Sequence, residues 1–248
     1  MLSPDATDPP PGQQWLGHPG AAAGPTGPAF LFDLDGTLVD SVYQHVLAWR
    51  EALEACGIEL SVWRIHRRVG MSGGLMANAI LRETGHQVTA EEAARLLKFH
   101  AEAYARQAGQ IRPLPGAREL LAYLTKAKVP WTIATSARLD SARPTLAALG
   151  IGPEVPVVTR DQVPHAKPDP DLFLEAARRL GVPISAAFVV GDSVWDLLAA
   201  QRARALGVGL LSGGYGQDEL ERAGAYRVYQ DPAGLLRHLD EVGVRVAN

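Results

Sequence analysis

Short apolar runs and amphipathic repeats alternate along most of this chain. Residues 29–32 are apolar at every position, which is typical of a strand buried on both faces of a parallel sheet. Similar runs predict strands at residues 129–134, 155–158, 186–192, 205–210 and 226–229. Helical patterns separate these runs, so we predict an α/β fold with a Rossmann-like, mostly parallel sheet covered on both faces.

A long helical stretch interrupts this alternation directly after the first strand. Residues 42–53, 75–85 and 89–107 carry apolar side chains at helical spacing, and no strand pattern lies between residues 42 and 110. We therefore predict an all-helical insertion over residues 42–110.

This insertion divides the chain into domains. The α/β core consists of residues 29–41 and 111–248, on either side of the insertion at 42–110. Residues 1–28 are rich in proline, glycine and small side chains. They carry too little apolar surface to offset the entropy cost of folding, so we expect a disordered N-terminal arm.

Composition narrows the class of protein. A net charge of -3 and 47% hydrophobic residues are ordinary for a globular protein, and the basic residues are too scattered for a nucleic-acid surface. Cys56 is the only cysteine, which excludes an intrachain disulfide and favours a reducing compartment. Neither a membrane-spanning run nor a signal-peptide pattern is present in the sequence. We expect a cytoplasmic monomer or homodimer that binds neither nucleic acid nor a membrane.

Two carboxylates follow the first strand. Side chains alternate along a strand, so Asp33 and Asp35 should point the same way at the carboxyl end of the sheet. Like charges this close are unfavourable without a cation, and Mg²⁺ would relieve the repulsion and attract phosphate oxygens. The alternative is a strand that simply ends in an acidic turn.

Two further polar signals follow later in the chain. Thr135 and Ser136 end the strand before them and offer hydroxyl and backbone N–H groups to a phosphate oxygen, although both residues are also common in turns. Lys167 precedes two prolines that would stiffen its loop and aim its ammonium group. The alternative for Lys167 is a solvated surface lysine.

A second acidic pair follows a later strand. Asp192 ends that strand, and Asp196 lies four residues on, so both can face the same site. Oxygen ligands of this kind suit Mg²⁺. The alternative is that Asp192 caps the following helix.

Together these segments resemble the four motifs of the haloacid dehalogenase superfamily in order, spacing and strand context. The motifs are DLDGTLVD, the Thr135 strand end, Lys167 before proline, and GDSVWD. The resemblance implies that Asp33 is a nucleophile that forms an aspartyl-phosphate, and that Asp35 is the general acid and then the general base. It also implies that Thr135 and Lys167 bind the phosphoryl group. The implied Mg²⁺ ligands are Asp33, Asp35 through its carbonyl, and Asp192, with Asp196 in support.

Within the superfamily the chain resembles the phosphoglycolate phosphatase and β-phosphoglucomutase branch. The resemblance implies that residues 42–110 form a small cap that closes over the site and excludes water. His45 belongs to a pattern in the helix that enters the cap, found in both the phosphoglycolate phosphatases and the β-phosphoglucomutases. It either assists proton transfer or packs between cap and core.

The turn at residues 70–74 falls where members of this branch carry a substrate-specificity loop. It contains Gly70, Ser72 and Gly73, and it follows Arg67 and Arg68. These arginines are candidates to bind a substrate carboxylate or second phosphate, or they are solvated beside a helix end. In the mutases an arginine usually follows the serine of this loop, whereas Gly73 follows Ser72 here, which weighs against a mutase.

We therefore expect a Mg²⁺-dependent phosphatase for a small phosphorylated metabolite, either phosphoglycolate-like or a sugar phosphate. A sugar-phosphate mutase of the β-phosphoglucomutase type is the alternative. A dehalogenase is less favoured because dehalogenases of the superfamily need no second carboxylate, and Asp35 is present. A binding module without activity is also less favoured, since clustered carboxylates are costly without a use.

Overall fold

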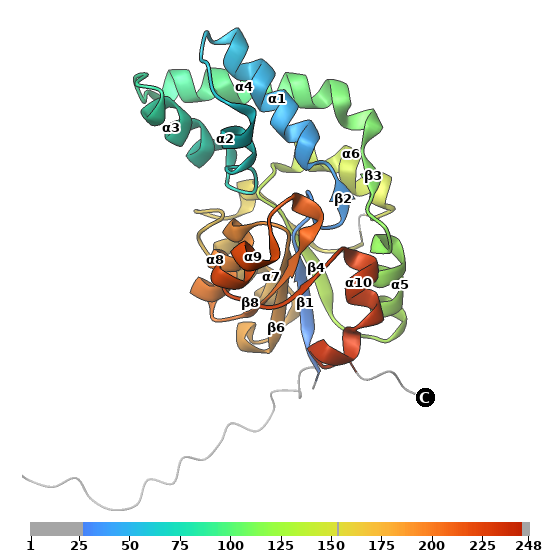
Figure 1. The fold of residues 1–248 in the computed structure, drawn as a ribbon. Helices are drawn as coiled ribbons and strands as arrows, with labels where there is room; N and C mark the ends of the chain where they lie inside the picture. Colours follow the sequence, from blue (N-terminus) through green and yellow to red (C-terminus); the bar gives the residue numbers. More distant parts are fainter. Residues whose placement is uncertain (1–26, 153, 245–248) are drawn as a thin grey trace, which may run out of the picture.

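A six-stranded parallel sheet forms the centre of the molecule in the computed structural model, which describes residues 27–152 and 154–244 (Figure 1). The strand order is β5-β4-β1-β6-β7-β8, and every pair is parallel. The strands are β1 Ala29–Phe32, β4 Trp131–Ala134, β5 Val157–Val158, β6 Ala187–Gly191, β7 Leu206–Leu210 and β8 Ala225–Tyr229. The predicted α/β fold with a mostly parallel sheet is confirmed.

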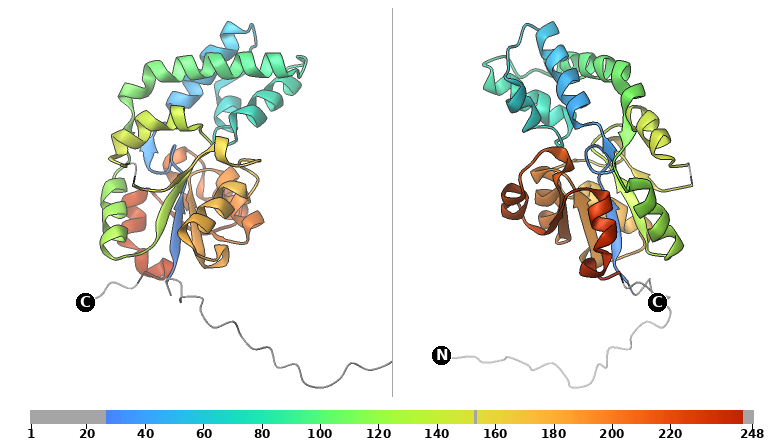
Figure 2. Two further views of the ribbon diagram at one scale, coloured as in Figure 1. Left: turned by 180° about the vertical axis from the view of Figure 1, so that it is seen from behind. Right: turned by 45° about the vertical axis from the view of Figure 1, so that its right-hand side comes forward.

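Helices cover both faces of the sheet (Figure 2). Phe30 and Phe32 of β1 pack with residues of α5, α6 and α10, whereas Ala29 and Leu31 pack with residues of α7 and α8. Because side chains alternate along a strand, a fully apolar β1 can supply both cores. The helices of this part are α5 Ala117–Lys126, α6 Leu139–Leu149, α7 Asp171–Leu180, α8 Val194–Ala203, α9 Gln217–Arg222 and α10 Pro232–Arg237.

The remaining helices form a separate unit above the carboxyl ends of the strands (Figure 1), which we call the cap. These are α1 Val42–Ala55, α2 Val62–His66, α3 Gly73–Glu83 and α4 Ala90–Gln107. Their apolar side chains make a cluster of their own. The segments that enter and leave the cap, β2 Val39–Asp40 and β3 Arg112–Pro113, pair antiparallel. The chain therefore enters and leaves the cap side by side.

Several elements differ from the sequence-based expectations. The strands β4 and β5 each begin two residues later than predicted, and the Val129 N–H bonds back to Leu124 to close α5. The pair β2 and β3 was not predicted, because two-residue strands show no periodicity. Helix α6 begins at Leu139, whose N–H donates to Asp161 Oδ1 at 3.1 Å. The expected disordered arm, apart from residues 27 and 28, lies outside the described residues.

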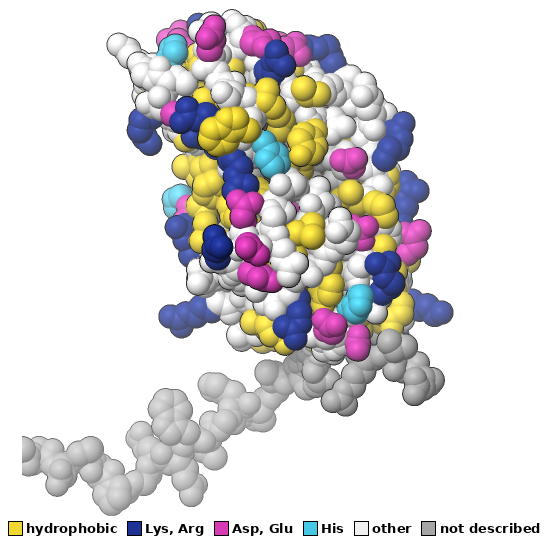
Figure 3. Space-filling view, viewed as in Figure 1, with side chains coloured by type: hydrophobic (Ala, Val, Ile, Leu, Met, Phe, Trp, Pro, Cys, Tyr) yellow, Lys and Arg dark blue, Asp and Glu magenta, His cyan; other side chains and the backbone are white. Residues whose placement is uncertain are grey.

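Surface and hydropathy bear on the expected partners. On the face shown in Figure 3, lysine and arginine side chains are spread among acidic ones rather than gathered in one patch. Within the described ranges, no helix combines the length and the apolar character that crossing a bilayer requires. The cytoplasmic location and the monomeric or dimeric state stay predictions.

Candidate active site

A cavity of about 420 Å³ lies between the carboxyl edge of the sheet and the cap. Asp33 follows β1 and Thr135 follows β4, and both line the cavity from the core side. His45 and Trp49 of α1 line it from the cap side. The cavity therefore lies between predicted catalytic residues of the core and the helical insertion. This position agrees with the general rule that ligands bind beyond the carboxyl ends of parallel strands.

Lys167 lies buried between two carboxylates. Its Nζ forms an ion pair with Asp33 and a second with Asp196 Oδ1 at 2.8 Å. Burial alone would lower the pKa of Lys167, but Asp196 and Asp33 more than offset it and raise the pKa above its ordinary value. Lys167 is thus a fixed, permanently charged group, and the alternative of a solvated lysine is wrong.

Three buried carboxylates meet beside this lysine. Asp33, Asp192 and Asp196 each offer an oxygen, and these atoms lie within 4.8 Å of one another. Burial raises the pKa of Asp33 to about 7. It also raises the pKa of Asp192 well above its ordinary value, and the neighbouring carboxylates add to this effect. An oxygen-only donor set with excess negative charge fits a hard divalent cation.

The Asp192 carboxylate is positioned by its neighbours and does not cap the following helix. Its Oδ1 accepts a hydrogen bond from Thr37 Oγ1 at 2.8 Å. A Cβ added at Gly36 or Gly213 would collide with its carboxylate, and Gly36 has a φ of +83°. Ser193 caps α8 instead, so the alternative in which Asp192 caps that helix is wrong.

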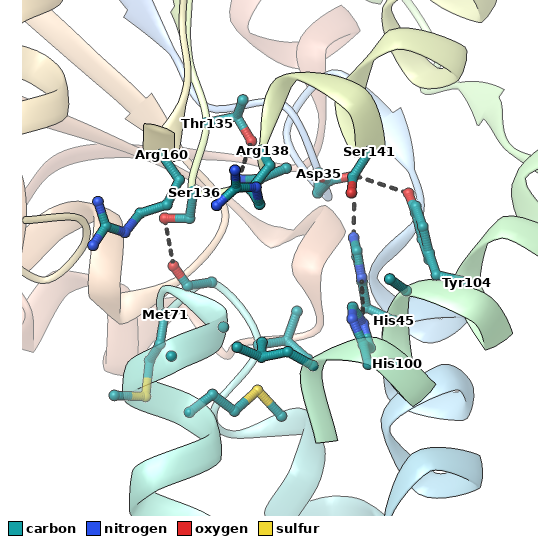
Figure 4. Close-up of a pocket in the computed structure, with 18 of the residues that line it drawn as sticks. Asp35, His45, Met71, His100, Tyr104, Thr135, Ser136, Arg138, Ser141 and Arg160 are labelled. Atoms are coloured by element: carbon teal, nitrogen blue, oxygen red, sulfur yellow. Dashed lines mark hydrogen bonds and ion pairs between the residues drawn. The ribbon is translucent and has the colours of Figure 1, made fainter. Parts of the chain in front are cut away.

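The carboxylate of Asp35 lies outside the acidic cluster and has different partners (Figure 4). Its Oδ1 accepts hydrogen bonds from Ser41 Oγ at 2.7 Å and from Tyr104 OH at 3.3 Å. His45 Nε2 lies 3.4 Å from the same oxygen. Burial would raise the pKa of Asp35, but His45 and the Ser41 hydroxyl lower it below its ordinary value. Asp33 and Asp35 both line the cavity, and the charge of Asp35 adds to the effect of burial in raising the pKa of Asp33, but the two carboxylates have different hydrogen-bond partners.

The cap supplies the groups that surround Asp35. His45 stacks on Tyr104 with ring centroids 4.0 Å apart, and its Nδ1 lies 3.2 Å from His100 Nε2. Burial lowers the pKa of His100 well below its ordinary value, so this ring is neutral at physiological pH. Sequence reasoning selected His45 but missed His100 and Tyr104. Their spacing of four residues on one helix face was the available signal.

The strand-end hydroxyls also line the cavity. Thr135 Oγ1 accepts from the Ala137 N–H at 3.0 Å, which closes the turn after β4. Ser136 Oγ donates to the Gly70 carbonyl at 3.4 Å and so connects the core to the cap. Thr135 therefore stabilises a turn and also lines the cavity, so its role in the turn does not exclude contact with a ligand.

The glycine-rich turn of the cap lies partly on the cavity. Gly70 and Gly73 line it together with Met71. Ser72 is buried, and its backbone N–H donates to the Lys167 carbonyl at 3.3 Å. The turn thus contacts the loop that carries the buried lysine.

Two predicted substrate arginines lie elsewhere. Arg67 forms an ion pair with Glu219, and Arg68 forms one with Glu83. Neither arginine is among the residues that line the cavity. The cavity instead contains Arg138 and Arg160, from the loops after β4 and β5, which sequence reasoning missed.

Comparison with curated proteins identifies similar phosphatases. Over 179 residues the chain is 36% identical to "Hexitol phosphatase A" of Escherichia coli K12, covering 70% of this chain and 78% of the relative. Over 202 residues it is 32% identical to a "Phosphoglycolate phosphatase" of Caulobacter vibrioides, covering 80% of this chain and 85% of the relative.

Solved structures and a family model agree with this likeness. A hydrolase from Pseudomonas syringae is 57% identical with a TM-score of 0.86, covering 88% of this chain and 100% of that one. A β-phosphoglucomutase from Clostridium difficile, 24% identical with a TM-score of 0.75, covers 87% of this chain and 96% of that one and shares the fold. The family model described as haloacid dehalogenase-like hydrolase matches residues 28–204. The chain therefore belongs to the haloacid dehalogenase-like hydrolase family.

Proposed function

We propose that this hydrolase is a Mg²⁺-dependent phosphatase that cleaves a small phosphorylated metabolite through an aspartyl-phosphate on Asp33. The observation that carries the proposal is Lys167, buried in ion pairs with Asp33 and Asp196 beside Asp192. A fixed cation and carboxylates clustered around Asp33, which lines the cavity, suit a phosphoryl group. The names of the two curated relatives, a hexitol phosphatase and a phosphoglycolate phosphatase, support the same class of reaction.

In the first step the Asp33 carboxylate attacks phosphorus, and the bond from phosphorus to the leaving oxygen breaks. Lys167 and the Thr135 and Ser136 groups bind the phosphoryl oxygens. Asp35 gives a proton to the leaving oxygen. The negative charge of the bound phosphate raises the pKa of Asp35 and favours the protonated form that this step needs.

In the second step water attacks phosphorus and releases Asp33. Asp35 takes the proton from this water, and the lowered pKa that His45 and Ser41 give its carboxyl keeps it ionised before this step, so that it can accept the proton. Asp33, the Asp35 carbonyl and Asp192 would hold Mg²⁺, with Asp196 in support. When bound, this cation supplies positive charge that offsets the repulsion between Asp33 and the phosphate.

The cap, residues 42–110, acts as a lid over the core, which consists of residues 29–41 and 111–248. The contacts of Ser136 with Gly70, and of Ser72 with Lys167, support closure of the cap over the phosphoryl site. A closed cap would exclude bulk water and complete the site by bringing His45 to Asp35.

The test is the turnover of p-nitrophenyl phosphate with and without Mg²⁺. The wild-type protein should require the metal, and Asp33→Asn should lose more than about a hundredfold in kcat, because an amide cannot attack phosphorus. Asp218→Asn is the matched control, since the Asp218 side chain is 80% exposed on α9. Equal activity of Asp33→Asn and wild type, or full activity in EDTA, would refute the proposal.

A further inference from the structure

The cavity has a second charged region that the proposed chemistry does not use. Arg138 lies three residues after Thr135, and Arg160 lies two residues after β5. Both line the same cavity as Asp33 and Asp35. In Figure 4, Arg138 lies between Asp35 and Arg160, and the Arg160 side chain extends away from Asp35.

The two arginine loops are held to each other. The Arg160 N–H donates to the Ala137 carbonyl at 3.0 Å, so the loop after β5 is tied to the loop that carries Arg138. The Arg160 guanidinium donates through Nη1 to the Val163 carbonyl at 2.7 Å and keeps its other N–H groups free for a ligand. Arg160 is only partly exposed. A guanidinium anchored in this way loses little conformational freedom when it binds an anion.

Neither Arg138 nor Arg160 forms an ion pair with a carboxylate within residues 27–152 and 154–244. The Thr159 hydroxyl and, to a smaller extent, the charge of Arg138 lower the pKa of the nearby Asp161 carboxyl. Asp161 also lines the cavity, but its Oδ1 accepts from Thr159 Oγ1 at 2.9 Å and from the Leu139 N–H at 3.1 Å. Its carboxylate is thus engaged in shaping the loop. Two guanidinium groups against one carboxylate leave a net positive charge at this end of the cavity.

The cap wall of the cavity is largely apolar. The cavity lining from the cap includes six apolar side chains, Trp49, Val69, Met71, Met76, Leu97 and Ala101, whereas its polar side chains His45, His100 and Tyr104 gather beside Asp35. Sugar hydroxyls placed against this wall would lose hydrogen bonds to water without gaining partners, at a cost for each of them. The volume of about 420 Å³ falls within the range of roughly 300–1,000 Å³ that is usual for small-molecule sites, and it exceeds what a group as small as glycolate needs.

We propose that the substrate is a phosphate monoester whose leaving group has an apolar body and a second anionic group, bound by Arg160 and Arg138. The inference rests on the proposed phosphatase function and names its substrate class. The apolar body packs on Met71, Trp49 and their neighbours in the cap. The second anion, a carboxylate or a phosphate, accepts hydrogen bonds from the two guanidinium groups, which favour planar bidentate contacts with such oxygens.

The test compares aryl phosphates that differ only in the para group. The probes are phenyl phosphate, 4-carboxyphenyl phosphate, 4-(aminomethyl)phenyl phosphate and 1,4-phenylene bisphosphate, with glucose 6-phosphate as a polar substrate. Wild-type kcat/KM should be about tenfold or more higher for the carboxyphenyl ester or the bisphosphate than for phenyl phosphate, as expected for charge-assisted hydrogen bonds. Whichever of the two esters is preferred identifies the second anion as carboxylate or phosphate. Glucose 6-phosphate should be a poorer substrate than phenyl phosphate.

Variants link this preference to the two arginines. In Arg160→Gln and Arg138→Gln, the ratio of kcat/KM for the preferred anionic ester to that for phenyl phosphate should fall about tenfold. Arg160→Lys should restore part of the ratio, and Arg160→Glu should favour the aminomethyl ester. The control is Arg143→Gln, because the Arg143 side chain is 70% exposed on α6 and lines no part of the cavity, and its ratio should match the wild type.

The outcomes separate this inference from the proposed function. Turnover of phenyl phosphate without any preference for a second anion would overturn the inference and leave the phosphatase proposal standing. An unchanged ratio in both glutamine variants, or a preference for glucose 6-phosphate, would also overturn it. Failure of the wild-type protein to hydrolyse any of the esters in Mg²⁺ would refute the phosphatase function itself.

Discussion

Arg67 of the cap forms an ion pair with Glu219 of the core, and its guanidinium lies 4.3 Å from the centre of the Tyr215 ring. The Arg67 carbonyl accepts hydrogen bonds from Tyr215 OH at 3.0 Å and from Trp195 Nε1 at 3.3 Å. His66, the neighbouring residue, lies 2.8 Å from the Gly213 carbonyl through its Nε2. The segment after α2 is therefore attached to the core by side-chain and backbone contacts that do not involve the cavity.

Replacing Arg67 should weaken cap closure without changing substrate preference. In Arg67→Ala, kcat/KM should fall by the same factor for phenyl phosphate and 4-carboxyphenyl phosphate, because both need the closed cap. Glu219→Gln should give a change in the same direction, and the double variant should be less affected than the sum of the two, since the residues share one interaction. A loss confined to the anionic ester would mean that Arg67 contacts substrate, as its position in the sequence first suggested.

Removing the buried lysine should destabilise the metal-free protein. Lys167→Met leaves the Asp33 and Asp196 carboxylates buried without their cation, and breaking a buried ion pair in this way costs about 3–5 kcal/mol. Urea unfolding in EDTA measures the loss, and added Mg²⁺ should restore part of it. The account fails here if the variant is as stable as the wild type in EDTA.

The Asp33 carboxyl should give the metal-free protein stability that is lost as pH rises from about 4 to about 7. Burial raises the pKa of Asp33 from 3.8 to about 7, so over this interval the folded state holds a proton that the unfolded state releases. This contribution falls as pH rises, whereas His100, whose pKa burial lowers, gives a contribution that rises with pH. Asp33→Asn has no proton to lose at this position, so its free energy of unfolding should fall less, or rise more, with pH than that of the wild type. Urea unfolding of both proteins in EDTA across this pH range measures the difference, and identical slopes would contradict the assignment.

A methyl group at Gly213 should disturb the acidic cluster. A Cβ there would overlap the Asp192 carboxylate, so Gly213→Ala should weaken Mg²⁺ binding by about tenfold or more, as changes beside metal ligands commonly do. Calorimetric titration with Mg²⁺ measures the affinity. Gly109→Ala is the control, because a Cβ at Gly109 meets nothing within 4 Å. Equal affinities in the two variants would mean that Asp192 does not hold the metal.

The sequence predicted the sheet and the positions of the acidic groups because both depend on local pattern. A fully apolar β1 and carboxylates at strand ends are visible in short windows, and parallel strands bring such ends together. The partners of Arg67 and Asp35 were not predictable in this way. Glu219 lies 152 residues from Arg67, and Tyr104 lies 69 residues from Asp35. These pairs depend on how the cap sits on the core, which no local pattern encodes.

The formation of an aspartyl-phosphate tests the central claim most directly. Asp35→Asn lacks the base of the second step, so it should accumulate the intermediate with an activated ester such as p-nitrophenyl phosphate in Mg²⁺. Rapid acid quenching and mass spectrometry of the peptide that contains Asp33 would detect the added phosphoryl group. The account predicts this adduct on Asp33 in Asp35→Asn and its absence when Asp33→Asn is also introduced. An adduct on another residue, or continued turnover by Asp33→Asn at the wild-type rate, would contradict it.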